Sequence, residues 1–254
     1  MWLEAGLARL VDDFWGALPY DPPAFPRDLS RVASMALPVV AKELPHLSLK
    51  SVNRWLGERN MAENISGPNR LLRGCMLAYG GYGIVLADSN DPADEKRFTV
   101  AHELAHFLID YSQPRARAIE ALGEGIIPVL DGLRDATRVE RLHAVLSTVP
   151  LGLHVELMER TTVGGYTAKA TLDAEDRADR LALELLAPAE DALEAMSDLI
   201  ESSGLSRNSR RVQATRLLAS RYGLPEAQAR DYARLLLKDV ERGSSFQDWI
   251  GIVR

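Results

Sequence analysis

The sequence predicts an α+β protein that is predominantly helical and contains a small β-sheet. Apolar residues recur at helical spacing over most of the 254 residues. Short apolar runs around Gly-Gly pairs occur in two places, and such runs are typical of strands in hairpins. A chain of this length can bury a sizeable core and fits one large domain or two small ones. The single cysteine, Cys75, excludes an internal disulfide, and its apolar neighbours Met76 and Leu77 indicate a small buried residue.

Residues 1–65 are expected to form an N-terminal helical region. Apolar positions in the first eighteen residues repeat at helical spacing and stop at the proline-rich segment "PYDPPAFPRD". A second helical pattern runs through "RVASMALPVVAKEL" and is interrupted at Pro38. A third helix is predicted in "SLKSVNRWLGERN", where Ser48 can cap the first turn.

A hairpin and a long helix follow. The runs "LLRGCMLAYG" and "YGIVLADS" predict two strands joined at a Gly-Gly turn. The segment "DPADEKRFTVAHELAHFLID" then predicts a helix with Asp91 as its N-cap and Pro92 just inside. Pro114 follows the expected end of that helix.

The second half of the chain returns to helices around one further pair of strands. Residues 116–149 are helical in composition but broken by "GEGIIP". The runs "LHVELMERTT" and "GGYTAKATL" indicate the second strand pair, and a helix is expected to begin near Asp173. The polar segment "ESSGLSRNSR" suits a linker, and two helical patterns beyond it flank "RYGLPE".

The stretch "FTVAHELAHFLID" carries the clearest chemical signal. On a helix His102 and His106 lie on one face, one turn apart, so both imidazoles can bind a single metal ion. Glu103 lies about 100° around the helix, which places its carboxylate beside the ion and suits a general base. The alternative is an amphipathic helix that contains this pattern by chance. A buried histidine pair beside an acid is costly without a partner such as a metal, which favours the metal site.

A third ligand is needed, because catalytic zinc sites usually take three protein ligands and leave one position for water. In "DAEDRADRLALELLAP" the acids Glu175 and Asp179 are one helical turn apart. One carboxylate could bind the metal, and the other could accept a hydrogen bond from the far nitrogen of a ligand histidine.

These two segments together resemble the ImmA/IrrE family of zinc metallopeptidases. The family pattern is an Arg-Phe-Thr-x-Ala-His-Glu-x-x-His helix followed by Glu-x-x-Ala-Asp/Asn-x-Phe-Ala-x-x-Leu-Leu-x-Pro, and the resemblance runs from about residue 71 to residue 188. It implies a zincin-like metallopeptidase core at 66–200 that binds Zn²⁺. The implied roles are metal ligand for His102, His106 and Glu175, base for Glu103, and hydrogen-bonding partner of a ligand histidine for Asp179.

The sequence departs from the family pattern in two ways. Leu181 stands where the family usually has phenylalanine, which is a mild apolar exchange. The spacing between the two motifs indicates an insertion at about 112–170 that could shape substrate choice or supply another ligand, Glu120 or Glu124. The ordinary interpretation of those two acids is a solvated helix face.

Further side chains could contact the substrate. His154, Tyr111 and Tyr166 are candidates for stabilising the developing oxyanion, although packing is the ordinary role of each tyrosine. His46 and His143 are expected to be exposed to solvent.

The C-terminal region, residues 206–254, predicts a helix-turn-helix-like unit. It is locally basic, and the residues responsible are Arg207, Arg210, Arg211, Arg216 and Arg221. One interpretation is DNA binding, and the other is a helical hairpin that packs on the peptidase. The family resemblance favours the second, because relatives carry a similar unit thought to help hold a protein substrate.

The chain as a whole is therefore expected to be a zinc-dependent endopeptidase. The resemblance implies a regulatory protease that cleaves a helix-turn-helix transcriptional repressor in a stress response or in mobile-element induction. The alternative is a DNA- or partner-binding regulator with a latent or structural metal site. The formal net charge of −6 argues against a surface coated by nucleic acid, and no apolar run is long enough for a membrane span. A cytoplasmic location is expected, since the N-terminus lacks the pattern of a secretory signal.

Overall fold

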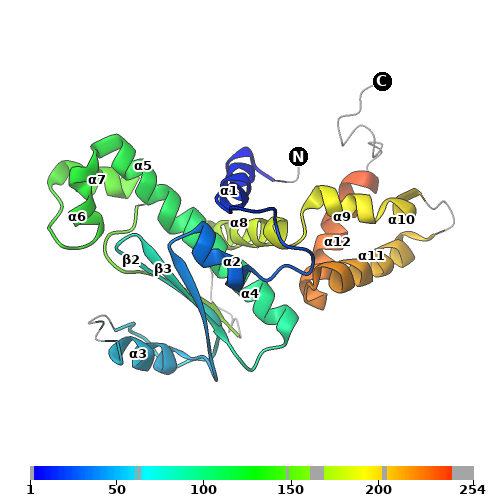
Figure 1. The fold of residues 1–254 in the computed structure, drawn as a ribbon, viewed down its shortest axis with the longest axis horizontal. Helices are drawn as coiled ribbons and strands as arrows, with labels where there is room; N and C mark the ends of the chain where they lie inside the picture. The colour runs from blue at the N-terminus through cyan, green and yellow to red at the C-terminus, as the bar shows by residue number, and fades with distance from the viewer. Residues whose placement is uncertain are drawn as a thin grey trace.

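The computed structural model describes residues 3–59, 61, 64–146, 149–160, 169–201 and 205–241. Within these ranges a small four-stranded sheet is surrounded by helices, which confirms the predominantly helical α+β class (Figure 1). The strands are β1 (Val39–Leu44), β2 (Leu72–Tyr79), β3 (Tyr82–Asp88) and β4 (His154–Glu159). The α-helices are α1 (Ala5–Gly16), α2 (Leu29–Ala36), α3 (Leu49–Gly57), α4 (Ala93–His106), α5 (Gln113–Leu122), α6 (Ile127–Leu130), α7 (Arg138–Leu146), α8 (Lys169–Leu186), α9 (Ala189–Ala195), α10 (Ser197–Glu201), α11 (Arg207–Tyr222) and α12 (Glu226–Glu241). A π-helical turn, η1 (Phe107–Ser112), joins α4 to α5, and a short 3₁₀ turn, η2 (Glu124–Ile126), precedes α6.

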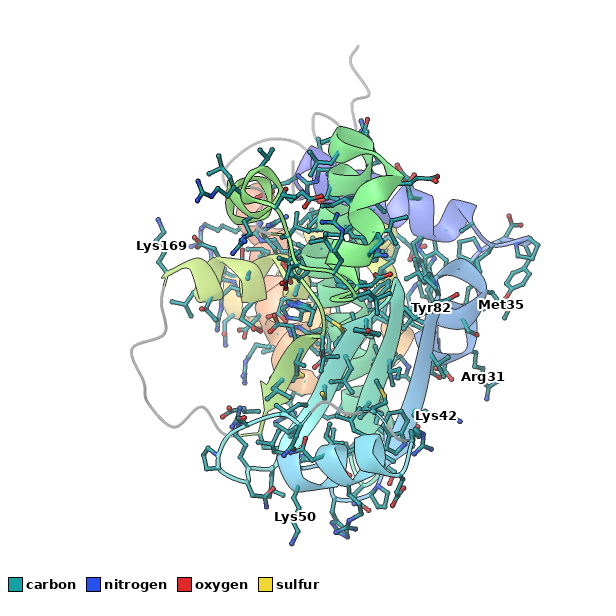
Figure 2. All side chains as sticks on the ribbon, turned by 90° about the vertical axis from the view of Figure 1, so that its left-hand side faces the viewer. Arg31, Met35, Lys42, Lys50, Tyr82 and Lys169 are labelled. Carbon is teal, nitrogen blue, oxygen red and sulfur yellow. The ribbon has the colours of Figure 1, made fainter. Side chains whose placement is uncertain are left out.

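The sheet has the strand order β1-β3-β2-β4. β2 and β3 form the predicted hairpin, and Gly80 and Gly81 in its turn adopt φ values of 60° and 86°. Positive φ at both central residues is the geometry of a two-residue type I′ hairpin turn, and glycine adopts it without strain. β4 pairs antiparallel with β2, whereas β1 pairs parallel with β3. In Figure 2, Lys42 marks the β1 side of the sheet, and Lys169 marks the start of α8 on the opposite side of the molecule.

Each face of the sheet is covered by helices. The side chains of Met76 and Ala78 belong to the main core, which also contains the buried face of α4. Cys75 and Leu77 point to the opposite face and pack in a second cluster with residues of α3. This alternation follows from the two-residue period of a strand, and both faces are apolar because both are buried. The prediction that Cys75 is buried is confirmed.

One segment predicted as helical is a strand. The helix prediction for "RVASMALPVVAKEL" holds only up to Ala36, and Val39–Leu44 form β1 instead. Proline cannot continue the α2 hydrogen bonds, and the two valines that follow it favour extended backbone. The carbonyl of Pro38 accepts a hydrogen bond from the Gly83 N–H at 2.9 Å, which sets the register of β1 on β3.

The long helix differs from the prediction at both ends. Pro92, not Asp91, occupies the N-cap position of α4, and the Asp91 carboxylate forms an ion pair with Arg160 at 2.7 Å. At the other end Pro114 does not stop the helix. It lies in the first turn of α5, where a missing N–H is tolerated after the π-helical turn.

The second predicted strand pair is half correct. His154–Glu159 form β4, but residues 169–172 of "GGYTAKATL" open helix α8, which therefore begins four residues before Asp173. The Gly-Gly pair and Tyr166 lie outside the described residues. Ser48 caps α3 as predicted, with its hydroxyl accepting the Ser51 N–H.

The helices α11 and α12 form a hairpin that packs beside α8 and α9, and their buried residues are part of the main core (Figure 1). Gly223 ends α11 in the left-handed conformation, and its carbonyl accepts a hydrogen bond from Arg97 of α4 at 2.7 Å. The Tyr232 hydroxyl donates to the Ala187 carbonyl at 2.9 Å. These contacts hold the hairpin against the α4–α8 pair. No helix in the described part of the chain is both long and apolar enough to cross a bilayer.

Candidate metal centre

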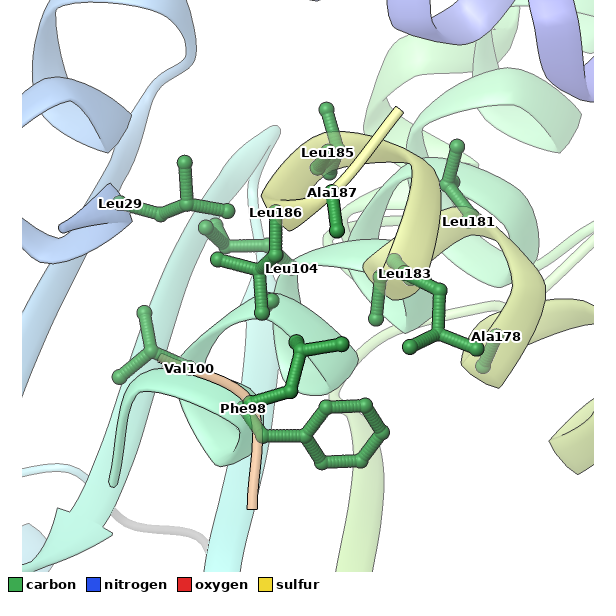
Figure 3. Packing of buried hydrophobic residues seen from close by; sticks show 14 of the residues in the cluster. Leu29, Phe98, Val100, Leu104, Ala178, Leu181, Leu183, Leu185, Leu186 and Ala187 are labelled. Carbon is green, nitrogen blue, oxygen red and sulfur yellow. The ribbon is translucent and has the colours of Figure 1, made fainter. Parts of the chain in front are cut away.

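The site lies where α4 packs against α8 and the sheet. Figure 3 shows the apolar side of this contact, where Phe98, Val100 and Leu104 of α4 belong to the same buried cluster as Leu181, Leu183 and Leu186 of α8. Every residue of α4 from Phe98 to His106 is buried, and buried residues of α8 recur at helical spacing, so packing of the two helices brings stretches that are distant in sequence side by side. The polar residues between them are then held close together.

The structure brings His102, His106 and Glu175 into one cluster. The Nε2 atoms of His102 and His106 are 3.1 Å apart, and the Glu175 carboxylate lies 3.3 Å from the first and 3.8 Å from the second. One nitrogen or oxygen atom from each residue lies within 4.8 Å of the others. Both histidines are almost fully buried, while Glu175 is on the open side.

Each histidine is oriented by a carboxylate behind it. The Nδ1 of His102 is 2.8 Å from Asp179, in the position predicted for that acid. The Nδ1 of His106 is 2.7 Å from Asp110, a contact that was not predicted. The available signal was the four-residue spacing from His106 to Asp110, which places the two on one side of a helix. With Nδ1–H donated to a carboxylate, the Nε2 lone pair of each ring is free to bind a cation.

This donor set fits a zinc ion. Two imidazole nitrogens and one carboxylate are the ligand types of many catalytic zinc sites. The 3.1 Å between the Nε2 atoms of His102 and His106 lets both reach one ion at the usual Zn–N distance of about 2.0–2.1 Å. Without a cation, two lone pairs would face each other in a buried site, which is unfavourable.

The charges around the histidines favour positive charge at this position. Burial alone would lower the pKa of His102, but hydrogen bonds with Asp179 and Glu175 outweigh it and raise that pKa to about 9. For His106, burial is again outweighed, here by Asp110 and Glu175, and its pKa rises to about 10. Hydrogen bonds from these two histidines lower the pKa of Glu175 far below its ordinary value. The same field that favours protons here favours a divalent cation.

Glu103 is fully buried next to the two histidines, and neither carboxylate oxygen has a hydrogen-bond partner among the described residues. Burial raises its pKa to about 7, against the opposing effect of His102 and His106. A carboxylate with a pKa near neutrality can both take up and release a proton. Gly74 of β2 makes room for it, because a Cβ at that position would lie 2.7 Å from a Glu103 oxygen and 2.5 Å from the Thr99 methyl.

β4 adds a second group of polar side chains to the wall of the site. His154 stacks on Tyr111 with ring centroids 6.3 Å apart, and its Nε2 is 3.4 Å from the Glu156 carboxylate. Burial lowers the pKa of His154 and raises that of Glu156, and both groups interact electrostatically with His106. His154 therefore remains a candidate for contacting the substrate.

The other candidates lie elsewhere. Glu120 and Glu124 are exposed and are not part of the ligand cluster. The Tyr111 hydroxyl accepts the Gly81 N–H at 2.8 Å, which gives it a packing role. His46 is exposed in a loop, as expected. The His143 side chain lies outside the described part of the structure, as does all of Tyr166.

Buried histidines that share a helix with a glutamate, joined by a carboxylate from a second helix, have the composition of a mononuclear catalytic metal site. The comparison with protein families agrees: residues 61–124 match the model of the M78 peptidases, described as the IrrE N-terminal-like domain. This match supports assignment to the ImmA/IrrE family and suggests a metallopeptidase. It contains the His102 helix and ends before Glu175, so the third ligand rests on the geometry. Searches of curated proteins and of solved structures gave no match.

Proposed function

We propose that the protein is a zinc-dependent endopeptidase. The observation that carries the proposal is the convergence of His102, His106 and Glu175 beside the buried Glu103, whose carboxylate has no hydrogen-bond partner among the residues that the structure describes. The family match to M78 peptidases supports the same reaction class. In this proposal residues 66–200 form a zincin-like core with an insertion at about 112–170, flanked by an N-terminal region at 1–65 and the helix-turn-helix-like region at 206–254.

In the proposed hydrolysis the side chains of the site have three roles: binding the metal, transferring a proton and orienting the ligand histidines. His102, His106 and Glu175 would hold the ion, and Zn²⁺ bound there lowers the pKa of water and polarises the peptide carbonyl. Glu103 accepts a proton from the attacking water and passes it to the leaving nitrogen, a role suited to a buried carboxylate next to the two ligand histidines. Asp110 and Asp179 keep the imidazoles in the tautomer whose Nε2 is free.

The sheet provides a place for an extended peptide. β4 is an edge strand, and no described strand pairs with its outer side. An extended chain can add to such an edge through main-chain hydrogen bonds, which do not depend on the side chains of the substrate. His154 and Glu156 lie two residues apart on β4 and so point to the same face, next to the histidine cluster. This arrangement supports a polypeptide substrate.

The substrate in this proposal is a helix-turn-helix transcriptional repressor, cleaved in a regulatory setting in the cytoplasm. The family resemblance supports that choice. A search for the substrate compares the active protein with Glu103→Gln, which removes the base and keeps every ligand. Each is added with zinc to a cell extract, and newly formed protein N-termini are identified by mass spectrometry. Elemental analysis of both proteins measures bound zinc.

We expect about one zinc per chain in both proteins and new N-termini only with the active one. Equal cleavage by both would contradict the role of Glu103. No zinc in either protein after dialysis against excess zinc would contradict the metal site itself. The alternative function, a DNA- or partner-binding regulator with a structural metal, would instead show zinc in both proteins and cleavage in neither.

A further inference from the structure

The hairpin of α11 and α12 contains a groove that the proposed reaction does not use. The groove has a volume of about 780 Å³ and runs between the two helices, with Asp94 of α4 at its margin. Asp94 is eight residues before His102, which is about 12 Å along the axis of α4. The groove is therefore separate from the metal site, and the first turn of α4 reaches its margin.

Arginines line both walls of the groove. Arg211 and Arg216 come from α11, and Arg230 and Arg234 come from α12. Among the described residues of the lining, two are acids, Asp94 and Glu226. In a chain with a formal net charge of −6, four arginines around one concavity are a local excess of positive charge.

Three of these guanidinium groups, those of Arg216, Arg230 and Arg234, retain hydrogen-bonding capacity. Arg234 forms an ion pair with Asp231 at 3.2 Å, but both side chains are more than half exposed and such a pair contributes little. Arg216 and Arg230 are exposed and form no ion pair within the described part of the chain. Arginine forks bind carboxylates through two parallel hydrogen bonds, so the walls are suited to acidic side chains.

Apolar residues also line the groove. Val212 is 43% exposed, and Ala219 and Leu224 also line the groove. A duplex nucleic acid would contact the arginines through its phosphates and would leave this apolar part of the lining unused. A peptide with acidic residues on either side of an apolar one complements both the arginines and the apolar residues of the lining.

We propose that this groove is a docking site for an acidic segment of a partner protein that carries an apolar anchor. The inference goes beyond peptide hydrolysis, because binding at the groove does not require the metal site. The hairpin is held in place by buried contacts of Tyr222 and Tyr232, so the arginines are presented from a fixed scaffold. A preformed surface loses little conformational entropy on binding.

The test measures binding to the full chain by fluorescence anisotropy. The probe is a pool of labelled twelve-residue peptides in which three acidic residues stand on each side of one apolar residue. The variant Arg216→Glu with Arg230→Glu reverses two charges in the groove. The matched control, Arg9→Glu with Arg138→Glu, makes the same change in net charge at exposed sites on α1 and α7. Thermal unfolding verifies that both variants fold.

We expect the groove variant to bind at least tenfold more weakly than the parent and the control to change less than twofold. Replacing the apolar residue of the peptide by serine should also weaken binding. The Glu103→Gln protein should bind like the parent, so failure of the proposed peptidase and failure of this site are distinguishable. No binding, or equal loss in both charge variants, would overturn the proposal. Tighter binding of a twenty-base-pair duplex that is lost in the groove variant would overturn the choice of a peptide.

Discussion

Asp110 allows a specific test of the metal centre, because it contacts the Nδ1 of His106, on the side of the ring away from Nε2, and is not a member of the ligand cluster. Its carboxylate is 2.7 Å from the His106 Nδ1, and the histidine side chain is only 3% exposed. Loss of such an orienting contact typically costs 10–100-fold in metal affinity. Asp110→Asn keeps an acceptor oxygen and loses the charge, so we expect about tenfold weaker zinc binding, which corresponds to about 1.4 kcal/mol. Asp110→Ala removes the acceptor as well and should reach about 100-fold.

Competition with a zinc chelator measures this change directly and needs no substrate. Glu120→Gln is the matched control, since it removes an exposed carboxylate from the neighbouring helix α5. Its zinc affinity should equal that of the parent. The reasoning would be refuted if Asp110→Ala bound zinc as tightly as the parent while His106→Ala did not.

Three further changes test the site and its support. Glu175→Ala should lower zinc affinity more than Asp110→Ala does in the same chelator assay, and parent-like binding would remove Glu175 from the ligand set. Gly74→Ala should reduce the free energy of unfolding by about 1–3 kcal/mol in urea, because its Cβ would meet Thr99 and Glu103; an unchanged midpoint would contradict that close contact. The third change concerns the buried carboxylate of Asp88. Burial alone would raise its pKa, but hydrogen bonds from Asn90, Arg160 and Leu47 outweigh that effect and hold the pKa below its ordinary value of 3.8. The ionised Asp88 carboxylate therefore stabilises the fold fully above pH 3.8, and this stabilisation is lost as the pH falls through the lower folded-state pKa. Asp88→Asn should destabilise the protein at pH 7 and flatten the acid limb of a curve of unfolding free energy against pH. A parallel shift of the whole curve would count against this assignment.

The local features of the chain could be predicted because they depend on residues close in sequence. The four-residue spacing of His102 and His106 fixes their common face on any helix. The Gly80–Gly81 pair sets the β2–β3 turn, and Ser48 caps α3, which begins at the next residue. Each of these outcomes depends on backbone conformation and hydrogen bonding within a few residues.

Contacts between distant segments were decided only by the tertiary structure. Val39–Leu44 form a strand because β3 offers a parallel partner, and nothing in that segment alone excludes a helix. Gly74 has no visible role in its own strand, but it lets β2 approach Glu103. The residue types and their spacing limit which side chains can bind a metal. The packing of α4 against α8 and the sheet selects the ones that meet. The physical reason is that burial of the shared apolar surface fixes the positions of the polar groups between these elements.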